Sequence, residues 1–189
     1  MPNLVDIGLQ ITPGPWLPEA HDLTRQPLWE QWVEAWLSDL VAPPLASEGY
    51  ELGILLTDDR EIQRLNRDYR GQDKSTDVLA FATADDTSAP DWMADCPVYL
   101  GDVVISMETA LRLQQSMAQR SNAAHTLTEE VAWLAAHGIL HLLGWDHPND
   151  LRLNQMLEKQ AQLLHQVDLT APYNHVSQLT PIPTITKTR

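Results

Sequence analysis

The chain has 189 residues, of which 43% are hydrophobic, and this length and composition are typical of one soluble globular domain. Its only cysteine, Cys96, excludes an internal disulfide and a zinc site built on paired thiolates, so a metal site must use histidine and carboxylate ligands. The formal net charge of −14 argues against a protein that coats nucleic acid by bulk electrostatics, although it permits a local cationic surface that binds RNA.

Hydrophobic periodicity, capping signals and turn residues predict a mixture of strands and helices along the chain. Strands are expected at residues 4–11, 50–57, 77–81 and 98–105. Helices are expected at residues 28–40, 59–69, 107–119, 127–143 and 151–167. Because strands and helices do not alternate strictly, we expect an α+β domain in which a small mixed sheet of about four strands packs with four to five helices.

One domain is expected over residues 1–169. The segment 85–97 is acidic and contains proline, which predicts an exposed loop, and residues 170–189 are rich in Thr and Pro, which predicts a loose C-terminal tail. No apolar run approaches the roughly 20 residues that cross a bilayer, and no basic region precedes an apolar stretch at the N-terminus. We therefore expect a cytoplasmic protein without a membrane partner.

Two of the expected helices carry clear start and stop signals. Asp58 and Glu61 have the spacing of a capping box before the helix at 59–69. Thr126 and Glu129 have the same spacing before the helix at 127–143, and Gly144 is its expected stop. That last helix is hydrophobic nearly all round, so we expect it at the centre of the fold.

Three histidines cluster around the end of this central helix. His137 and His141 are four residues apart, so they share one helix face with about 5–6 Å between their Cβ atoms, and both imidazoles can reach one ion. A turn at Gly144 can bring His147 back toward them. Three protein ligands with a fourth position open are the pattern of catalytic zinc, so we expect a zincin-like site with one Zn²⁺ per chain.

The alternative is that the helix histidines are ordinary core residues bonded to backbone carbonyls. We disfavour it, because polar imidazoles on an apolar helix need partners and a shared metal satisfies both. The same H-x-x-x-H-x-x-G-x-x-H spacing occurs in zinc peptidases, in which the residue after the first histidine is the glutamate that acts as general base. Here that residue is Gly138, so the general base of the peptidases is absent from its place, and this argues against a peptidase.

Residues 137–147, HGILHLLGWDH, resemble the signature of the YbeY family of bacterial endoribonucleases. Two further segments resemble this family in order and spacing, residues 65–81 and 100–105, so that the similarity spans roughly residues 50–165. Ala80 and Ala82 depart from the family pattern, where Ser and Pro are common, and neither touches the histidines.

The resemblance implies a metal-dependent, single-strand-specific endoribonuclease that matures ribosomal RNA, notably the small-subunit 3′ end, and acts in ribosome quality control. It implies single-stranded RNA as substrate and the ribosome or its proteins as partners. It also implies that His137, His141 and His147 are zinc ligands and that Arg70 is a catalytic arginine facing the metal.

The physical chemistry of Arg70 suits this role, because a planar guanidinium binds two phosphodiester oxygens and stabilises developing negative charge. Its alternative role is a helix C-terminal cation beside Gly71 that offsets the helix dipole. Arg60, Arg64 and Arg67 lie on the same side of this expected helix. For them we favour a solvated surface of paired charges over an RNA-binding face.

Two aspartates are candidates for orienting a metal-bound histidine or a water, Asp102 and Asp146, although either can simply cap a turn. Two other functions stay open. One is a zinc peptidase or another metal-dependent hydrolase that takes its base from elsewhere, such as Asp146. The other is a non-catalytic ribosome-assembly factor in which the zinc is structural and a cationic helix docks RNA.

Overall fold

The computed structural model describes residues 5–41, 49–83, 96–121 and 125–173. Its strands are β1 (Val5–Ile11), β2 (Tyr50–Thr57), β3 (Val78–Ala82) and β4 (Val98–Ser106). Its helices are α1 (Gln26–Leu40), α2 (Asp59–Arg70), α3 (Met107–Ser121), α4 (Leu127–Leu142) and α5 (Asp150–Gln166), with a short 3-10 turn η1 (His21–Thr24). The predicted α+β architecture is confirmed, whereas η1 was not expected.

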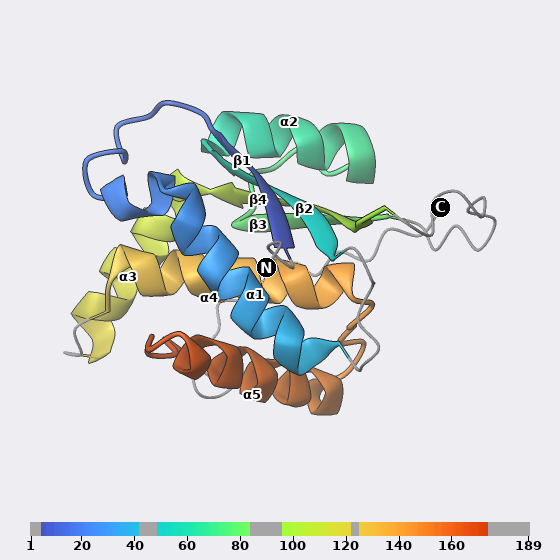
Figure 1. The fold of residues 1–189 in the computed structure, drawn as a ribbon. Coiled ribbons are helices and arrows are strands. Elements are labelled where there is room, and N and C mark those ends of the chain that lie inside the picture. Colours follow the sequence, from blue (N-terminus) through green and yellow to red (C-terminus); the bar gives the residue numbers. More distant parts are fainter. Residues whose placement is uncertain (1–4, 42–48, 84–95, 122–124, 174–189) are drawn as a thin grey trace.

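The four strands form one mixed sheet in the order β1-β2-β4-β3. β1, β2 and β4 are parallel, and β3 pairs with β4 in the antiparallel direction at the sheet edge. α2 covers one face of the sheet, whereas α1 and α4 lie on the other face, and α5 packs beneath α4 as a further layer (Figure 1). α4 is thus enclosed between the sheet and α5, as its apolar sequence predicts.

The main core lies between the sheet and the helices on the α4 side. Trp29, Trp32 and Trp36 of α1 are all buried in it, which confirms that their helical spacing marks a core face. The indole of Trp36 donates a hydrogen bond of 2.8 Å to the Leu163 carbonyl, so α1 and α5 are tied together. A smaller cluster around Ile62 lies under α2 on the other face of the sheet.

The helix boundaries follow local backbone chemistry. The Asp58 side chain accepts a hydrogen bond from the Glu61 N–H at the start of α2, and Gly71 ends this helix with φ +68°. α1 begins at Gln26, two residues before the predicted start, so Pro27 lies inside its first turn. Proline is favoured there because its missing N–H would have had no intrahelical acceptor.

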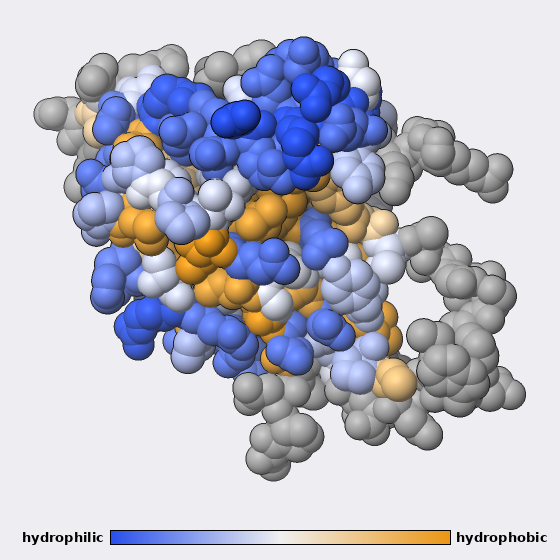
Figure 2. Space-filling view, turned by 90° about the horizontal axis from the view of Figure 1, so that it is seen from above, coloured by the Kyte–Doolittle hydropathy of each residue, from blue (hydrophilic) through white to orange (hydrophobic). Residues whose placement is uncertain are grey.

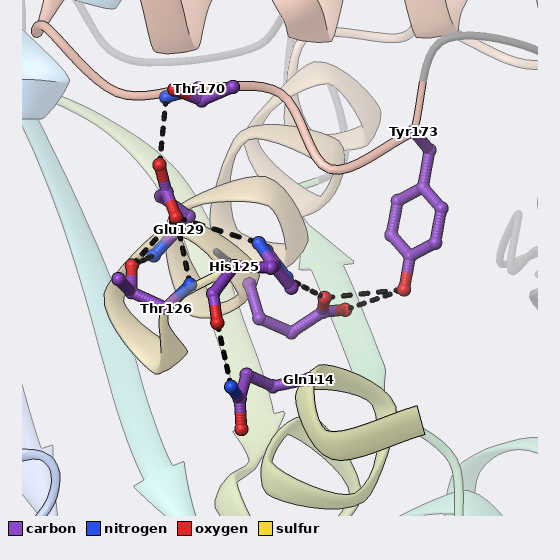
Figure 3. A network of polar contacts seen from close by, with 7 residues as sticks. Gln114, His125, Thr126, Glu129, Thr170 and Tyr173 are labelled. Atoms are coloured by element: carbon purple, nitrogen blue, oxygen red, sulfur yellow. Dashed lines mark hydrogen bonds and ion pairs between the residues drawn. The ribbon is translucent and has the colours of Figure 1, made fainter. Parts of the chain in front are cut away.

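A polar network anchors the start of α4 (Figure 3). The buried Glu130 carboxylate lies 2.7 Å from the Nε2 atom of His125 and accepts from the Tyr173 hydroxyl at 3.2 Å, while Gln114 donates to the His125 carbonyl at 2.6 Å. Burial raises the pKa of Glu130. Ala171 and Tyr173 are buried, so the first residues after 169 pack on the domain. Residues 174–189 and most of the expected 85–97 loop lie outside the described residues.

None of the helices in the described part of the chain combines the length and apolar character that a bilayer crossing requires.

Candidate metal centre

The local structure at the end of α4 brings the three histidines together. The reciprocal capping box of Thr126 and Glu129 starts α4, as predicted. The helix ends at Leu142, and Gly144 adopts φ +83°, a conformation that glycine reaches without steric cost. The chain turns there and returns toward the helix, where His147 meets the histidines on α4.

The imidazoles of His137, His141 and His147 converge on one point. One potential ligand atom from each lies within 4.8 Å of the other two. The Nε2 atoms of His137 and His141 are 3.1 Å apart. Two nitrogens bound tetrahedrally to one zinc at about 2.0–2.1 Å would be roughly 3.3 Å apart, so this spacing fits a shared ion. Three nitrogens leave a fourth coordination position for water or substrate.

Burial keeps these imidazoles in the neutral form that binds metal. His137 is buried, and desolvation lowers its pKa to about 3. Burial also lowers the pKa of His141, with a smaller contribution from the nearby His147, and burial lowers the pKa of His147 itself. All three side chains are therefore uncharged at neutral pH, with ring nitrogens available as ligands.

A buried glutamine fixes the orientation of His137. Gln160 of α5 is fully buried, and its Nε2 donates to the Trp133 carbonyl at 3.3 Å, so its Oε1 faces His137 Nδ1 at 3.1 Å. Because Oε1 can only accept, His137 carries its proton on Nδ1 and leaves the Nε2 lone pair directed at the other histidines. Sequence reasoning missed Gln160, although a lone polar residue on the apolar face of α5 was a usable signal.

Gly138 is accounted for by packing against the sheet. A Cβ atom at this position would lie 2.6 Å from Cγ1 of Val103 in β4. Gly138 therefore lies at the contact between α4 and β4. A side chain at this position would have to displace the sheet. The glutamate that serves zinc peptidases has no room at this position.

Arg70 lies on the helix that covers the opposite face of the sheet. It is partly buried at the end of α2, and its NH1 atom is 3.4 Å from Oδ1 of the buried Asn66, whose amide donates to the Lys74 carbonyl at 2.8 Å. α2 and α4 both run antiparallel to β4, so their C-terminal ends lie at the same end of the sheet (Figure 1). Arg70, the last residue of α2, therefore lies at the same end of the sheet as the C-terminus of α4, on the opposite face.

The other arginines of α2 belong mainly to its solvated surface. Arg64 forms ion pairs with Glu61 at 2.6 Å and with Asp68 at 3.2 Å, and Arg67 pairs with Asp68 at 3.1 Å. This supports the paired-charge interpretation for Arg64 and Arg67. Seen from above, the surface over α2 is hydrophilic, and hydrophobic residues gather beside it (Figure 2).

The two candidate aspartates differ in their relation to the histidines. Asp102 lines a cavity of about 410 Å³ on the α2 side of the sheet and accepts a 2.7 Å hydrogen bond from the Tyr99 hydroxyl. Its neighbour Val103 faces α4, so Asp102 points away from the metal centre. Asp146 accepts from the His147 N–H at 2.8 Å, and its charge acts to raise the pKa of His141.

A mixed sheet with a buried helix that presents three converging histidines fits the class of metal-dependent enzymes with a three-histidine site. The family model described as endoribonuclease YbeY matches residues 19–168. The chain belongs to the YbeY family of endoribonucleases, which are RNA-cleaving hydrolases, and the resemblance drawn from the sequence is confirmed.

Individual relatives cover most of the chain. It is 47% identical over 156 residues to the endoribonuclease YbeY of Acaryochloris marina, a match spanning 82% of this chain and 85% of the relative. With the endoribonuclease YbeY of Synechococcus elongatus it shares 40% identity over 184 residues, 95% of this chain and 97% of the relative. The solution structure of a Thermotoga maritima protein has the same fold, with a TM-score of 0.50, 23% identity and coverage of 86% of this chain and 89% of that one.

Proposed function

We propose that this endoribonuclease holds one Zn²⁺ on His137, His141 and His147 and cleaves single-stranded RNA in the maturation of ribosomal RNA, including the small-subunit 3′ end, and in ribosome quality control. Convergence of the three imidazole nitrogens carries the proposal. The ribosome or its proteins are the proposed partners, and the cytoplasm, where bacterial ribosomes mature, is the proposed location.

The donor set favours zinc, because three neutral imidazoles with one open position form a common catalytic zinc site. When bound, Zn²⁺ supplies Lewis-acid polarisation of a phosphoryl oxygen and lowers the pKa of water toward neutrality. The histidines contribute fixed lone pairs, and the proton that Gln160 holds on His137 Nδ1 keeps that ring in the binding tautomer.

Gln160→Leu is expected to weaken zinc affinity about 10- to 100-fold, because His137 loses the acceptor that sets its tautomer. Competition with a chromophoric chelator measures the affinity, and circular dichroism checks the fold. Gln162→Leu, an exposed glutamine on the same helix, is the matched control and should leave affinity unchanged. Unchanged affinity in Gln160→Leu would contradict a supporting role for this glutamine.

Arg70 is the proposed stabiliser of charge on the phosphate during cleavage. Its place at the end of α2, at the same end of the sheet as the C-terminus of α4, supports this role, and so does its contact with the buried Asn66, which restricts the guanidinium. Burial lowers the pKa of Arg70, but a guanidinium keeps its charge at neutral pH.

Arg70→Ala is expected to lower the cleavage rate roughly 100-fold or more while zinc stays at one per chain, because Arg70 stabilises charge and is not a ligand. Single-turnover cleavage and metal analysis of the same sample test both statements. Arg60→Ala removes an equal charge from an exposed position at the other end of α2 and is the control. Loss of zinc from Arg70→Ala would refute this division of roles.

The peptidase alternative is disfavoured by the packing of Gly138, which leaves no room for the glutamate base of that class. Incubation of the zinc-loaded protein with unstructured peptides and with RNA, at matched metal content, separates the two activities. We expect RNA cleavage without peptide cleavage.

A further inference from the structure

A cavity of about 490 Å³ opens beside the metal centre, between the turn that follows α4 and the first turns of α5. Trp145, Arg152 and Gln155 are among its lining residues. Its size falls within the range of small-molecule binding pockets, about 300–1,000 Å³. Because Trp145 is two residues from His147, their Cα atoms are at most about 7 Å apart.

Trp145 differs from the other tryptophans in the described part of the chain. Its exposed fraction is 36%, whereas Trp16, Trp29, Trp36 and Trp133 are at most 1% exposed. Its backbone is fixed, because its N–H donates to the Leu140 carbonyl at 3.0 Å and its backbone also bonds the His141 side chain. A hydrogen-bonded turn thus presents a large aromatic ring to solvent close in sequence to His147.

Arg152 supplies a cation to the lining of the same cavity. Its side chain is exposed, and its NH1 atom is 3.4 Å from Oε1 of Gln155. Within the described residues, no carboxylate lies within ion-pair distance of it, in contrast to Arg64 and Arg67 on α2. A positive charge in the first turn of a helix opposes the helix dipole, so helix electrostatics do not explain an arginine at position 152.

We propose that Trp145 and Arg152 form the subsite for the nucleotide next to the cleaved bond, in which Trp145 stacks on the nucleobase and Arg152 binds the phosphate. The proposal rests on the proposed function and specifies how RNA is held. An aromatic face stacks on any unpaired base, and a base within a duplex is not available to it. This subsite thereby accounts for a preference for single strands.

The stacking contact is tested with RNA that the zinc-loaded protein cuts at a mapped bond. Each base near this bond is replaced in turn by an abasic site that keeps the phosphate. We expect one abasic position to raise the KM of the wild-type chain roughly 5- to 150-fold, the range for loss of one stacked base. Trp145→Ala should raise the KM for intact RNA by a similar factor. The abasic RNA should raise the KM of Trp145→Ala no further. Trp145→Phe should retain most of the binding.

The phosphate contact is tested through salt dependence of binding to single-stranded RNA. Arg152→Gln should reduce the slope of log K against log salt concentration by about 0.7, the value for one phosphate on a single strand. Arg25→Gln removes the same charge at the start of α1, and Leu151→Ala changes an exposed neighbour. Both controls should keep the wild-type slope and KM.

Two results would overturn the subsite. The first is that every abasic position changes the KM of the wild-type chain and of Trp145→Ala by the same factor, which would mean that the ring contacts no base. The second is an unchanged salt slope in Arg152→Gln. If the wild-type chain with zinc cuts no RNA at all, the proposed function fails instead, so the two failures are distinguishable.

Discussion

Replacing His141 with alanine is expected to lower RNA cleavage about 1,000-fold or more and to release the zinc, while the chain stays folded. A catalytic metal ion typically supplies several kcal/mol of transition-state stabilisation, and each 1.36 kcal/mol corresponds to about tenfold in rate. His141 is the suitable position because it is only partly buried, so its removal opens no sealed cavity. Removal of the buried His137 would leave Gln160 without its partner and would confound folding with catalysis.

The His141→Ala experiment combines a cleavage assay, zinc analysis and thermal melting of one preparation. His165→Ala, an exposed histidine in the last turn of α5, is the matched control and should behave as the wild-type chain. Unfolding of His141→Ala at room temperature would instead support a structural metal in an assembly factor. Full cleavage without bound zinc would contradict the metal-dependent mechanism.

Gly138→Glu, which introduces the residue found in zinc peptidases, is expected to leave no stably folded protein and no peptidase activity. Its side chain would enter the contact between α4 and β4, where a Cβ atom alone would lie 2.6 Å from Val103 Cγ1. An unpaired buried carboxylate adds several kcal/mol to the steric cost, against a typical total stability of about 5–15 kcal/mol. Soluble yield and circular dichroism measure the outcome, with Thr128→Glu in the first turn of α4 as a tolerated control.

Gly138→Ala gives a graded form of the same test. Alanine favours a helix over glycine by about 1 kcal/mol, so helix propensity alone predicts a more stable protein. Overpacking typically costs about 1–3 kcal/mol, and so close a contact with a β-branched side chain belongs at the upper end. We expect a net loss of about 2 kcal/mol in the free energy of unfolding and partial recovery on adding Val103→Ala. A more stable Gly138→Ala variant would contradict the packing described at this position.

The features that sequence patterns predicted correctly are those set by neighbouring residues. The capping box at Thr126, the turn at Gly144 and the convergence of His137 with His141 all depend on residues within one or two helical turns. The α1 start differed by two residues, because proline at a helix start is indistinguishable in sequence from proline that precedes one.

The features that sequence reasoning could not provide depend on tertiary contacts. The hydrogen bond from His137 to Gln160 joins residues 23 positions apart, and the contact of Tyr173 with Glu130 spans 43 positions. The side of the sheet occupied by Asp102 follows from strand pairing and helix placement, which local periodicity does not specify. Sequence patterns therefore identified the three histidines that cluster in the structure, whereas the surrounding contacts required the folded structure.

The most direct test of the central claim is cleavage of a single-stranded RNA and of its duplex by the purified chain, before chelation, after chelation and after zinc is restored. We predict that the single strand is cut, that the duplex is spared, that chelation abolishes the activity and that zinc restores it. Cleavage that survives complete removal of the metal, or a chain with one zinc bound that cuts no RNA, would contradict this account.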